Sequence, residues 1–398
     1  MTSGGGADEG IDYEKLLREF GTQPIDEAVL KRFEEVTGAA PHPWLRRGVF
    51  FSHRDLLSLL DAHEKKEPMY LYTGRGPSSA SLHLGHLMPF IFTKWLQDVF
   101  DCPLVIQLTD DEKYLWKDLT EEEIHEMLIN NVKDIIAVGF KPDKTFIFNN
   151  LAYMGTMYPL VVQISKRITA STVKATFGVS DSDCIGKFAF CASQIAPSFP
   201  ACFPHIFGRA KKVRVLVPCG IDQDPFFRLA RDVAHRLKFP KASVLHSKFF
   251  PALQGSNTKM SASNQTSAIY MSDTANQIKN KINKYAFSGG QETLELHREL
   301  GGRTDVDVSY MYLTFFHLGP GSDEELAEIK EQYEKGTMST GELKAKLIGV
   351  LQEIVAKHQE AHAKVTDEVI AHYMSVRPLD YHVPQPPPPP VKKSKKKK

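Results

Sequence analysis

The chain has 398 residues, of which 42% are hydrophobic and 24% charged, and at this length we expect two or three domains. The glycine, proline and aromatic contents are ordinary, which excludes collagen-like, coiled-coil and wholly disordered proteins. The net charge is +1, but six lysines lie among the last seven residues, and without them 43 basic residues face 48 acidic ones, a net charge of −5. Any polyanionic partner should therefore contact local patches and not a global positive field.

Three absences describe the expected cellular setting. The five cysteines are odd in number and form no CxxC pair, so neither a disulfide framework nor a zinc ribbon is expected. The first 17 residues contain early acids and no apolar core, unlike a signal or transit peptide. No apolar run approaches the roughly 20 residues that cross a bilayer. We therefore expect a cytoplasmic protein without membrane contacts.

The chain begins with a segment that we interpret as an N-terminal extension, residues 1–66, partly disordered. Residues 1–10 are rich in glycine and polar, and a Pro-His-Pro-Trp turn lies at 41–44. Helical patterns occur at 13–20, 26–36 and 54–63.

From residue 67 to 273 short apolar strands alternate with helices. The predicted strands are 69–73, 103–108, 144–148, 213–217 and 243–246. The predicted helices are 84–97, one that Thr120 caps and Gly139 ends, and 224–237. Strands that alternate with helices of this length indicate an α/β fold with a parallel sheet.

After Asp273 the strand signals vanish. Leu343, Leu347, Val350, Leu351, Ile354 and Val355 form one helical stripe, and Thr366 caps a further helix. Residues 274–376 therefore predict an all-helical domain. Residues 377–398 end in five prolines and the lysine run, and we expect them to be a disordered tail with a stiff proline spacer.

Two motifs carry chemistry. His83-Leu-Gly-His86 follows the first parallel strand and opens a helix, where free N–H groups and the helix dipole favour phosphate. Gly85 would let a planar base approach the backbone. Lys259-Met-Ser-Ala-Ser263 lies in a polar loop after the last parallel strand, and its lysine could follow the charge that develops on a leaving pyrophosphate. By chance an HxGH motif occurs in roughly 4% of chains this long, and the second motif alone could be a solvated loop.

Together, in this order on a parallel α/β pattern, the motifs resemble the HIGH and KMSKS signatures of class I aminoacyl-tRNA synthetases. Longer strings are similar to the eukaryotic cytoplasmic tryptophanyl-tRNA synthetase family, namely those at 70–79, 106–116, 218–224 and 249–254. The resemblance covers roughly residues 20–376 and is much more specific than the two signatures.

The resemblance implies a Rossmann-like catalytic domain at 67–273 with an insertion at about 151–208, and a helical anticodon-binding domain at 274–376. It implies formation of tryptophanyl-adenylate from tryptophan and ATP carrying Mg²⁺, then transfer of tryptophan to tRNA(Trp). It also implies a homodimer. The apolar segment 188–207 needs burial, either against a partner or as an insertion packed on the sheet.

The same resemblance assigns ligand contacts. Tyr72 and Gln107 should meet the indole N–H, while Glu112, Gln194 and Gln223 should hold the α-amino end of tryptophan. Thr109 and Lys113 should lie close to the ligands. The residues expected at ATP are Arg75, Gly76, His83, Gly85, His86, Lys259 and Met260. His83, His86, Lys259 and Mg²⁺ should supply positive charge to the reacting phosphate, and Ser261 and Ser263 should add hydroxyl donors.

Some observations leave alternatives open. Tyr72 could be a simple core residue, whereas Gln107 in the apolar run LVIQL requires a buried partner or a ligand. The acidic segment 110–112 has no further ligand at metal spacing, so we expect no protein-held metal. Ala262 replaces the second lysine of the general signature, and the helix-turn-helix appendage of many eukaryotic relatives is not expected. Rival interpretations are a tyrosyl-tRNA synthetase, a small-molecule nucleotidylyltransferase and a non-catalytic RNA-binding derivative of a synthetase.

Overall fold

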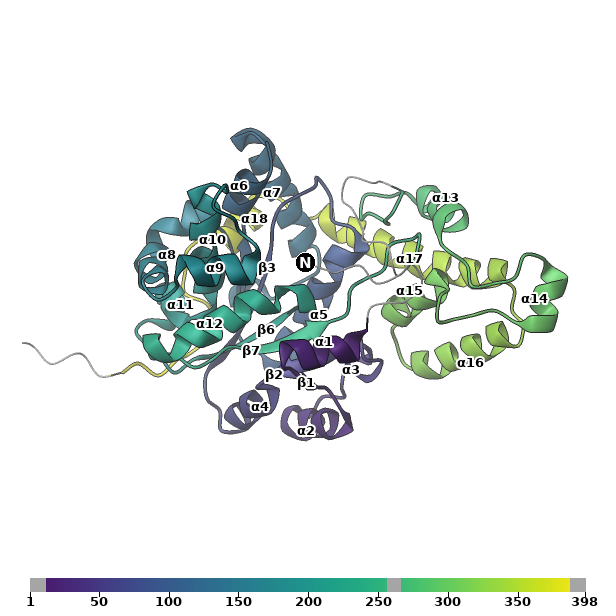
Figure 1. Ribbon diagram of the computed structural model, residues 1–398, viewed down its shortest axis with the longest axis horizontal. Coiled ribbons are helices and arrows are strands. Elements are labelled where there is room, and N and C mark those ends of the chain that lie inside the picture. The colour runs from purple at the N-terminus through teal and green to yellow at the C-terminus, as the bar shows by residue number, and fades with distance from the viewer. Residues whose placement is uncertain (1–11, 256–265, 387–398) are drawn as a thin grey trace, which may run out of the picture.

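Seven strands form one mixed sheet in a computed structural model that describes residues 12–255 and 266–386 (Figure 1). Their order across the sheet is β1-β2-β7-β6-β3-β4-β5. The strands are β1 Gln23–Pro24, β2 Phe50–Arg54, β3 Met69–Arg75, β4 Leu104–Leu108, β5 Thr145–Asn149, β6 Arg214–Gly220 and β7 Ser243–Ser247. The five strands predicted from the sequence are β3 to β7, and they pair in parallel as expected.

The parallel strands have the doubly wound order of a Rossmann-like sheet. The chain first moves outward from β3 through β4 to β5, then returns to the other side of β3 with β6 and β7. The order therefore reverses between β3 and β6, and ligands of such sheets bind at the carboxyl ends beside this reversal.

Two antiparallel strands at one side of the sheet, β1 and β2, were not predicted. β2 pairs with β7 and β1 pairs with β2. The sequence of β2, FFSHR, contains polar residues that interrupt its apolar run. Ser52 is nevertheless buried, and its Oγ lies 2.9 Å from His246 Nδ1 on β7. The hydrogen bond to His246 thus allows the polar side chain of Ser52 to be buried within a strand.

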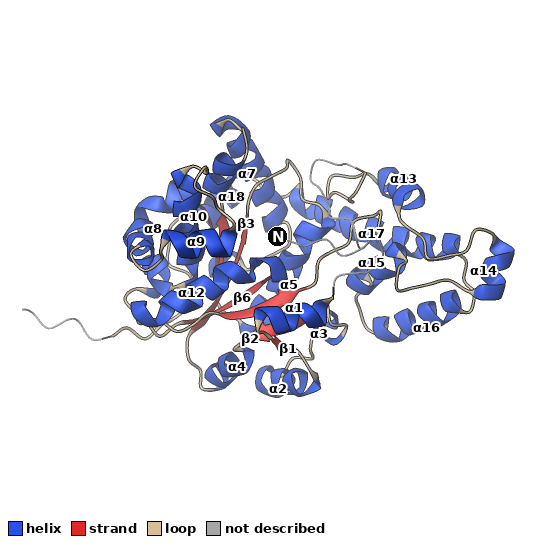
Figure 2. Cartoon of the chain, in the orientation of Figure 1, coloured by secondary structure: helices blue, strands red, loops and turns tan. Residues whose placement is uncertain are grey.

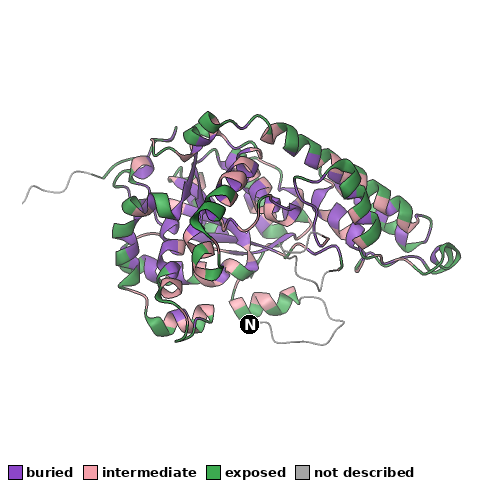
Figure 3. Cartoon of the chain, turned by 90° about the horizontal axis from the view of Figure 1, so that it is seen from above, coloured by how far each residue is buried: buried purple, intermediate pink, exposed green. Residues whose placement is uncertain are grey.

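Helices cover both faces of the sheet (Figure 2). Leu71 and Ile106 face one hydrophobic core with α2, α4, α5 and α7, and Tyr70 and Val105 face a second core with α8, α10, α11 and α12. Successive side chains of a strand point to opposite faces, and buried residues accordingly concentrate on the sheet and the inner sides of the helices (Figure 3). The helices are α1 Tyr13–Phe20, α2 Glu27–Thr37, α3 Pro43–Arg46, α4 Leu56–Glu64, α5 Leu84–Phe100, α6 Asp110–Trp116, α7 Glu121–Ile136, α8 Asn150–Ser165, α9 Ala170–Phe177, α10 Ile185–Ile195, α11 Pro204–Phe207, α12 Asp224–Leu237, α13 Ala275–Tyr285, α14 Leu294–Leu300, α15 Val308–Phe316, α16 Ser322–Glu334, α17 Thr340–His362 and α18 Asp367–Met374.

The region after Asp273 contains helices and no strand within the described residues, in agreement with the sequence pattern. The long helix α17 packs on α13 and α15 and also contacts α7 beside the sheet. The last helix, α18, packs on β5 and α7. The chain therefore returns to the sheet before residue 376, where the sequence had suggested the end of a separate helical domain.

The expectation of a disordered tail from residue 377 is wrong for its first ten residues, 377–386. Leu379 and Val383 are buried, because they pack against the core that contains Tyr70. The N–H of Met69 donates to Tyr381 Oη (3.1 Å), and the N–H of Arg209 donates to Gln385 Oε1 (2.9 Å). Residues 1–10 and the proline–lysine run after Pro386, which we also expected to be disordered, lie outside the described residues.

The apolar segment 188–207 is buried within its own chain. Phe190, Ile195, Phe199, Phe203 and Phe207 belong to the same core as Tyr70 and Phe146. The second of the two interpretations, an insertion packed on the sheet, therefore accounts for this segment, and its burial gives no support to a dimer.

Candidate active site

The carboxyl edge of the sheet gathers most of the predicted ligand contacts. Arg75 and Gly76 end or follow β3, Thr109 follows β4, and Gln223 follows β6. These residues flank the point between β3 and β6 where the strand order reverses, and ligands of such folds generally bind at the carboxyl edge beside this point. The parallel pairing of these strands brings together residues that are about 150 positions apart in the sequence.

The HLGH motif forms the start of α5. His83 is the N-cap residue, and its side chain makes no capping hydrogen bond. The rings of His83 and His86 are stacked with centroids 3.4 Å apart. Within the described part of the chain, Nδ1 of each ring is buried and has no hydrogen-bond partner. These atoms are therefore available to a ligand that approaches the helix N-terminus.

Both imidazoles are neutral at physiological pH. Burial, together with the charge of Arg75, lowers the pKa of His83 to about 3 and also lowers the pKa of His86. Arg75 itself stays charged, since burial lowers its pKa only to about 10. The expectation that the two histidines supply positive charge is therefore not supported for the free protein. They offer hydrogen bonds, and Arg75 is the cation beside them.

The segment after the KMSAS motif pairs with the HLGH motif. The N–H of Leu84 donates to Ile269 O (3.0 Å), and the N–H of Met271 donates to Leu82 O (2.8 Å). Leu253 before the motif donates to Ser267 O after it (3.0 Å). Lys259, Met260, Ser261 and Ser263 themselves lie outside the described residues. Their flanking segments nevertheless meet at the carboxyl edge, beside His83.

Two glycines mark close approaches. A Cβ on Gly76 would meet the ends of the Lys113 and Glu112 side chains, with Glu112 Oε2 at 2.5 Å, so a larger residue there would have to displace both. A Cβ on Gly85 would lie 3.1 Å from Cδ1 of Phe250. Phe250 and the ring of His83 thus fill the space on the Cβ side of Gly85.

Tyr72, Gln107 and Gln194 form one hydrogen-bonded group. Tyr72 Oη lies 2.6 Å from Gln107 Oε1 and 2.8 Å from the backbone oxygen of Gln194. Gln107 Nε2 donates to Asn150 Oδ1 (2.8 Å) and to Ser193 O (3.1 Å). Tyr72 and Gln107 are 1% and 0% exposed, so Tyr72 is a core residue as well as a candidate contact. An indole can reach these two oxygens only if a neighbouring element, such as α10, shifts.

Glu112 and Gln223, predicted at the α-amino end of tryptophan, and Thr109 and Lys113, predicted close to the ligands, do not all form one hydrogen-bonded group. Thr109 Oγ1 donates to Glu112 Oε2 (3.0 Å), and Lys113 Nζ donates to Glu112 Oε1 (2.8 Å). Gln223 is half-buried and donates to its neighbour Asp222 (3.1 Å). The structure therefore joins Thr109, Glu112 and Lys113 into one cluster beside Gly76, and it places Gln223 in the turn that follows β6, at the same edge of the sheet.

The sequence interpretation missed two residues of α7. Asn131 Oδ1 accepts a hydrogen bond from Arg75 Nε (2.9 Å). Asp134 accepts one from the N–H of Leu82 (2.9 Å) and another from His358 Nε2 of α17 (3.0 Å). These residues connect the helical region to the HLGH motif. A signal was present, because both are polar yet lie on the apolar side of a predicted amphipathic helix.

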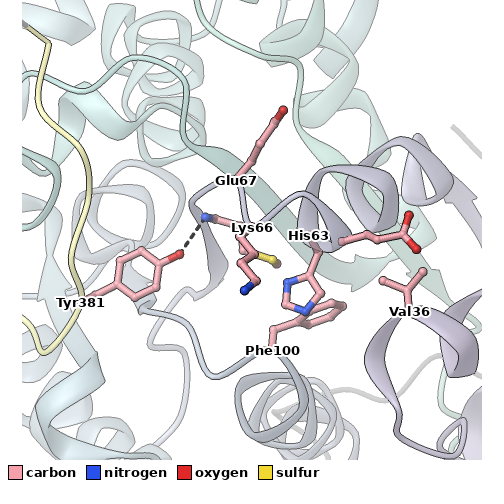
Figure 4. A pocket seen from close by; sticks show the side chains of 8 residues that line it. Val36, His63, Lys66, Glu67, Phe100 and Tyr381 are labelled. Atoms are coloured by element: carbon pink, nitrogen blue, oxygen red, sulfur yellow. Dashed lines mark hydrogen bonds between the residues drawn. The ribbon is translucent and has the colours of Figure 1, made fainter.

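A cavity elsewhere in the described residues lies far from this edge of the sheet. A hollow of about 470 Å³ lies at the amino end of β3, at the opposite edge of the sheet, and His63, Phe100 and Tyr381 line it (Figure 4). The described residues contain no group of three or more His, Cys, Asp or Glu side chains that could hold a metal ion. No helix in the described ranges is both long and apolar enough to span a bilayer.

Comparison with known proteins gives consistent matches. A family model described as tRNA synthetases class I (W and Y) matches residues 64–175 and 208–356. The chain is 57% identical over 377 residues to the cytoplasmic tryptophan–tRNA ligase of Oryctolagus cuniculus, across 94% of this chain and 79% of that protein. It is 57% identical over 371 residues to the same ligase of Schizosaccharomyces pombe, across 93% of both. The solved tryptophanyl-tRNA synthetase of Plasmodium falciparum is similar with a TM-score of 0.87 and 50% identity, across 92% of this chain and 98% of that one.

Proposed function

The chain belongs to the class I tRNA synthetases of the tryptophan and tyrosine group, and from this we infer that it is a tryptophan–tRNA ligase of the eukaryotic type. It activates tryptophan with ATP to tryptophanyl-adenylate and pyrophosphate, then transfers tryptophan to the 3′ end of its tRNA. The observation that carries this inference is a match at 57% identity to tryptophan–tRNA ligases over nearly the whole chain. The HLGH helix at the reversal point of the sheet supports it.

We propose that catalysis relies on positioning and charge stabilisation. The tryptophan carboxylate is already ionised, so its attack on the α-phosphorus of ATP needs no general base. His83 and His86 donate hydrogen bonds to the phosphates as neutral rings, and Arg75 and Lys259 supply positive charge. Ser261 and Ser263 add hydroxyl donors, and Met260 and Gly85 lie beside the nucleotide. Mg²⁺ enters with ATP and neutralises phosphate charge.

We propose that tryptophan binds with its indole N–H at Tyr72 and Gln107 and with its α-amino group toward Glu112, Gln194 and Gln223, while Thr109 and Lys113 lie close by. Gln223 approaches from the end of β6. Residues 67–273 would form the catalytic domain, with the insertion at 151–208. The helical region 274–376 would read the anticodon, although its last helix, α18, packs back on β5. The named relatives are cytoplasmic ligases, and we propose the same location for this protein.

Tryptophan-dependent exchange of pyrophosphate into ATP tests the function directly. We expect exchange with tryptophan and at most trace exchange with tyrosine, although the family includes synthetases for both amino acids. Exchange with tyrosine but not with tryptophan would replace the inference by its main rival. Exchange with neither, from a folded chain, would favour a non-catalytic derivative.

We also propose a homodimer. The observation that supports it is the exposed apolar face of α8; segment 188–207 is buried in its own chain and gives no support. Leu151, Tyr158 and Val162 of this helix are 59%, 57% and 48% exposed. The helix carries no charged side chain along its 16 residues. An apolar, uncharged outer face is unusual on a monomer and is typical of an interface between subunits.

Light scattering at micromolar concentration should therefore give the mass of a dimer. Tyr158→Glu should shift the protein toward the monomer, because it buries a charge in the apolar contact. Leu57→Glu is a matched control, since Leu57 is also an exposed apolar residue, at 41%, but belongs to α4. A monomer from the unaltered chain, or equal effects of both variants, would contradict the proposal.

We propose that the lysine run is a tRNA-capture arm on an otherwise acidic chain. A solubilising tail and a nuclear import signal are the alternatives. Truncation should begin after Pro386, because residues 377–386 pack on the folded part. We expect unchanged tryptophan activation, a raised KM for tRNA and a shallower salt dependence of tRNA binding. Each lost phosphate contact should reduce the slope of log affinity against log salt by about 0.7–0.9. Equal tRNA affinity and equal salt slope with and without the tail would rule out capture.

A further inference from the structure

Four side chains from four different elements form a hydrogen-bonded relay that ends at the proposed indole contact. Asp111 of α6 accepts a hydrogen bond at Oδ1 from Asn150 Nδ2 of α8 (2.8 Å). Asn150 Oδ1 accepts one from Gln107 Nε2 of β4 (2.8 Å). Gln107 Oε1 lies 2.6 Å from Tyr72 Oη of β3. Asn150 and Gln107 are each 0% exposed, so the bonds between the inner members are shielded from water, whereas Asp111 is half-buried at the outer end.

The chemistry of the first member gives the relay a direction. An ionised carboxylate can only accept hydrogen bonds. Asp111 therefore requires the amino group of the Asn150 amide, which turns the Asn150 carbonyl toward Gln107. Gln107 must in turn present its own amino group to Asn150, and the backbone oxygen of Ser193 accepts from the same atom (3.1 Å). The Gln107 carbonyl is left facing Tyr72.

Tyr72 is oriented in the same way. Its hydroxyl lies between Gln107 Oε1 and the backbone oxygen of Gln194, at 2.6 and 2.8 Å. Both neighbours are acceptors, so the Tyr72 proton is used within the protein and the lone pairs of Oη remain. The two oxygens at the end of the relay can thus accept a hydrogen bond from a ligand but cannot donate one.

We propose that Asp111 and Asn150 are specificity-determining positioning residues, which fix the Gln107 amide so that the pocket offers only acceptors and selects a side chain with a ring N–H. The proposal rests on the proposed function and deepens it. Neither residue would touch the ring. Reversal of the Gln107 amide would place an amino group where the indole N–H must approach, and two donors repel each other.

The surroundings of Asp111 give the relay a pH dependence. The groups that face this carboxyl are Asp110 and Glu112 from its own helix and Asn150 from α8. Burial raises the pKa of Asp111 to about 6, and the hydrogen bond from Asn150 opposes this shift. Above this pH the carboxylate is ionised and the direction is enforced. Below it the protonated carboxyl can donate, and the Asn150 amide is free to reverse.

The test compares tryptophan with an analogue of the same shape in which sulfur replaces the ring N–H. The measurement is the ratio of their kcat/KM values in pyrophosphate exchange at about pH 7.5. We expect Asp111→Asn, which keeps shape but can donate or accept, to lower this ratio by about tenfold. Asn150→Leu interrupts the relay from the other side and should lower the ratio at least as much.

Asp110→Asn is the matched control. Asp110 is the adjacent carboxylate and is 3% exposed. It accepts hydrogen bonds from Asn149 Nδ2 (2.6 Å) and from the backbone N–H groups of Asp111 (3.1 Å) and Leu151 (3.2 Å), but from no side chain of the relay. This variant should leave the ratio unchanged. In the unaltered enzyme the ratio should fall as the pH is lowered through about 6, and in Asp111→Asn it should not change over the same range.

An unchanged ratio in Asp111→Asn, or an equal loss in Asp110→Asn, would overturn the proposal, because the effect would then be absent or merely structural. If the ratio in the unaltered enzyme did not change as the pH was lowered through about 6, this result would also contradict the proposal. If the unaltered enzyme fails to exchange pyrophosphate with tryptophan, the proposed function and this proposal fall together. Tryptophan exchange with an unchanged ratio overturns the relay alone.

Discussion

The unaltered enzyme should use phenylalanine at least about 10⁴-fold less efficiently than tryptophan, and the amino-acid pocket by itself should achieve this discrimination. A site built around buried hydrogen-bonding groups rejects an analogue that cannot pair with them by 10⁴ to 10⁵. Phenylalanine lacks the ring N–H that the oxygens of Tyr72 and Gln107 would accept, and it also leaves part of the indole volume empty. Comparison of kcat/KM for the two amino acids in pyrophosphate exchange measures this discrimination.

Gln107→Ala should raise the KM for tryptophan or lower the turnover, and it should reduce the preference over phenylalanine. Gln97→Ala is a suitable control, because Gln97 is also a buried amide, 0% exposed, whose Nε2 donates to Thr145 Oγ1 (2.9 Å) away from the carboxyl edge. It should destabilise the fold without changing the preference. Equal use of phenylalanine and tryptophan by the unaltered enzyme would contradict the assignment of the pocket.

Lys259→Ala should slow adenylate formation on the order of 10²-fold or more, while ATP affinity in the ground state changes much less. The charge of this lysine matters most as negative charge develops on the leaving pyrophosphate. The contribution of Lys259 to the stabilisation of this charge should be large, because His83 and His86 are neutral and Ala262 replaces the second lysine of the general signature.

Single-turnover formation of the adenylate, with ATP binding measured separately, distinguishes the two effects. Lys279→Ala on α13 is the control, since Lys279 is exposed and lies outside the proposed site. It should behave as the unaltered enzyme in this assay, which contains no tRNA. A normal rate in Lys259→Ala would show that the motif has been given the wrong role.

The order of the local elements was determined by the sequence. The apolar runs of β3 to β7 and the amphipathic helices between them are signals that each segment carries within itself. The helix patterns at 13–20 and 224–237 coincide with α1 and α12, and the predicted capping box at Thr120 is present. Parallel strands with helical connections have few possible arrangements, so the fold class followed as well.

The same reasoning placed most of the candidate site. His83, Arg75, Gly76 and Thr109 stand directly after predicted strands or at the start of a predicted helix. Parallel pairing brings all such positions to one edge. The resemblance supplied the particular residues within that edge, and the sequence alone would have treated Tyr72 as core.

Only the tertiary structure decided features that depend on partners far away in the chain. β2 becomes a strand because His246 accommodates Ser52, and residues 377–386 are ordered because β3 and α11 bind them. The histidines of HLGH are neutral because other segments bury them beside Arg75. Asp111 and Asn150 are ordinary polar residues in the sequence, and they acquire a role only where α6, α8 and β4 meet. The physical reason is common to all four cases: burial, charge and hydrogen-bond direction are properties of the assembled environment, whereas periodicity and capping belong to the segment itself.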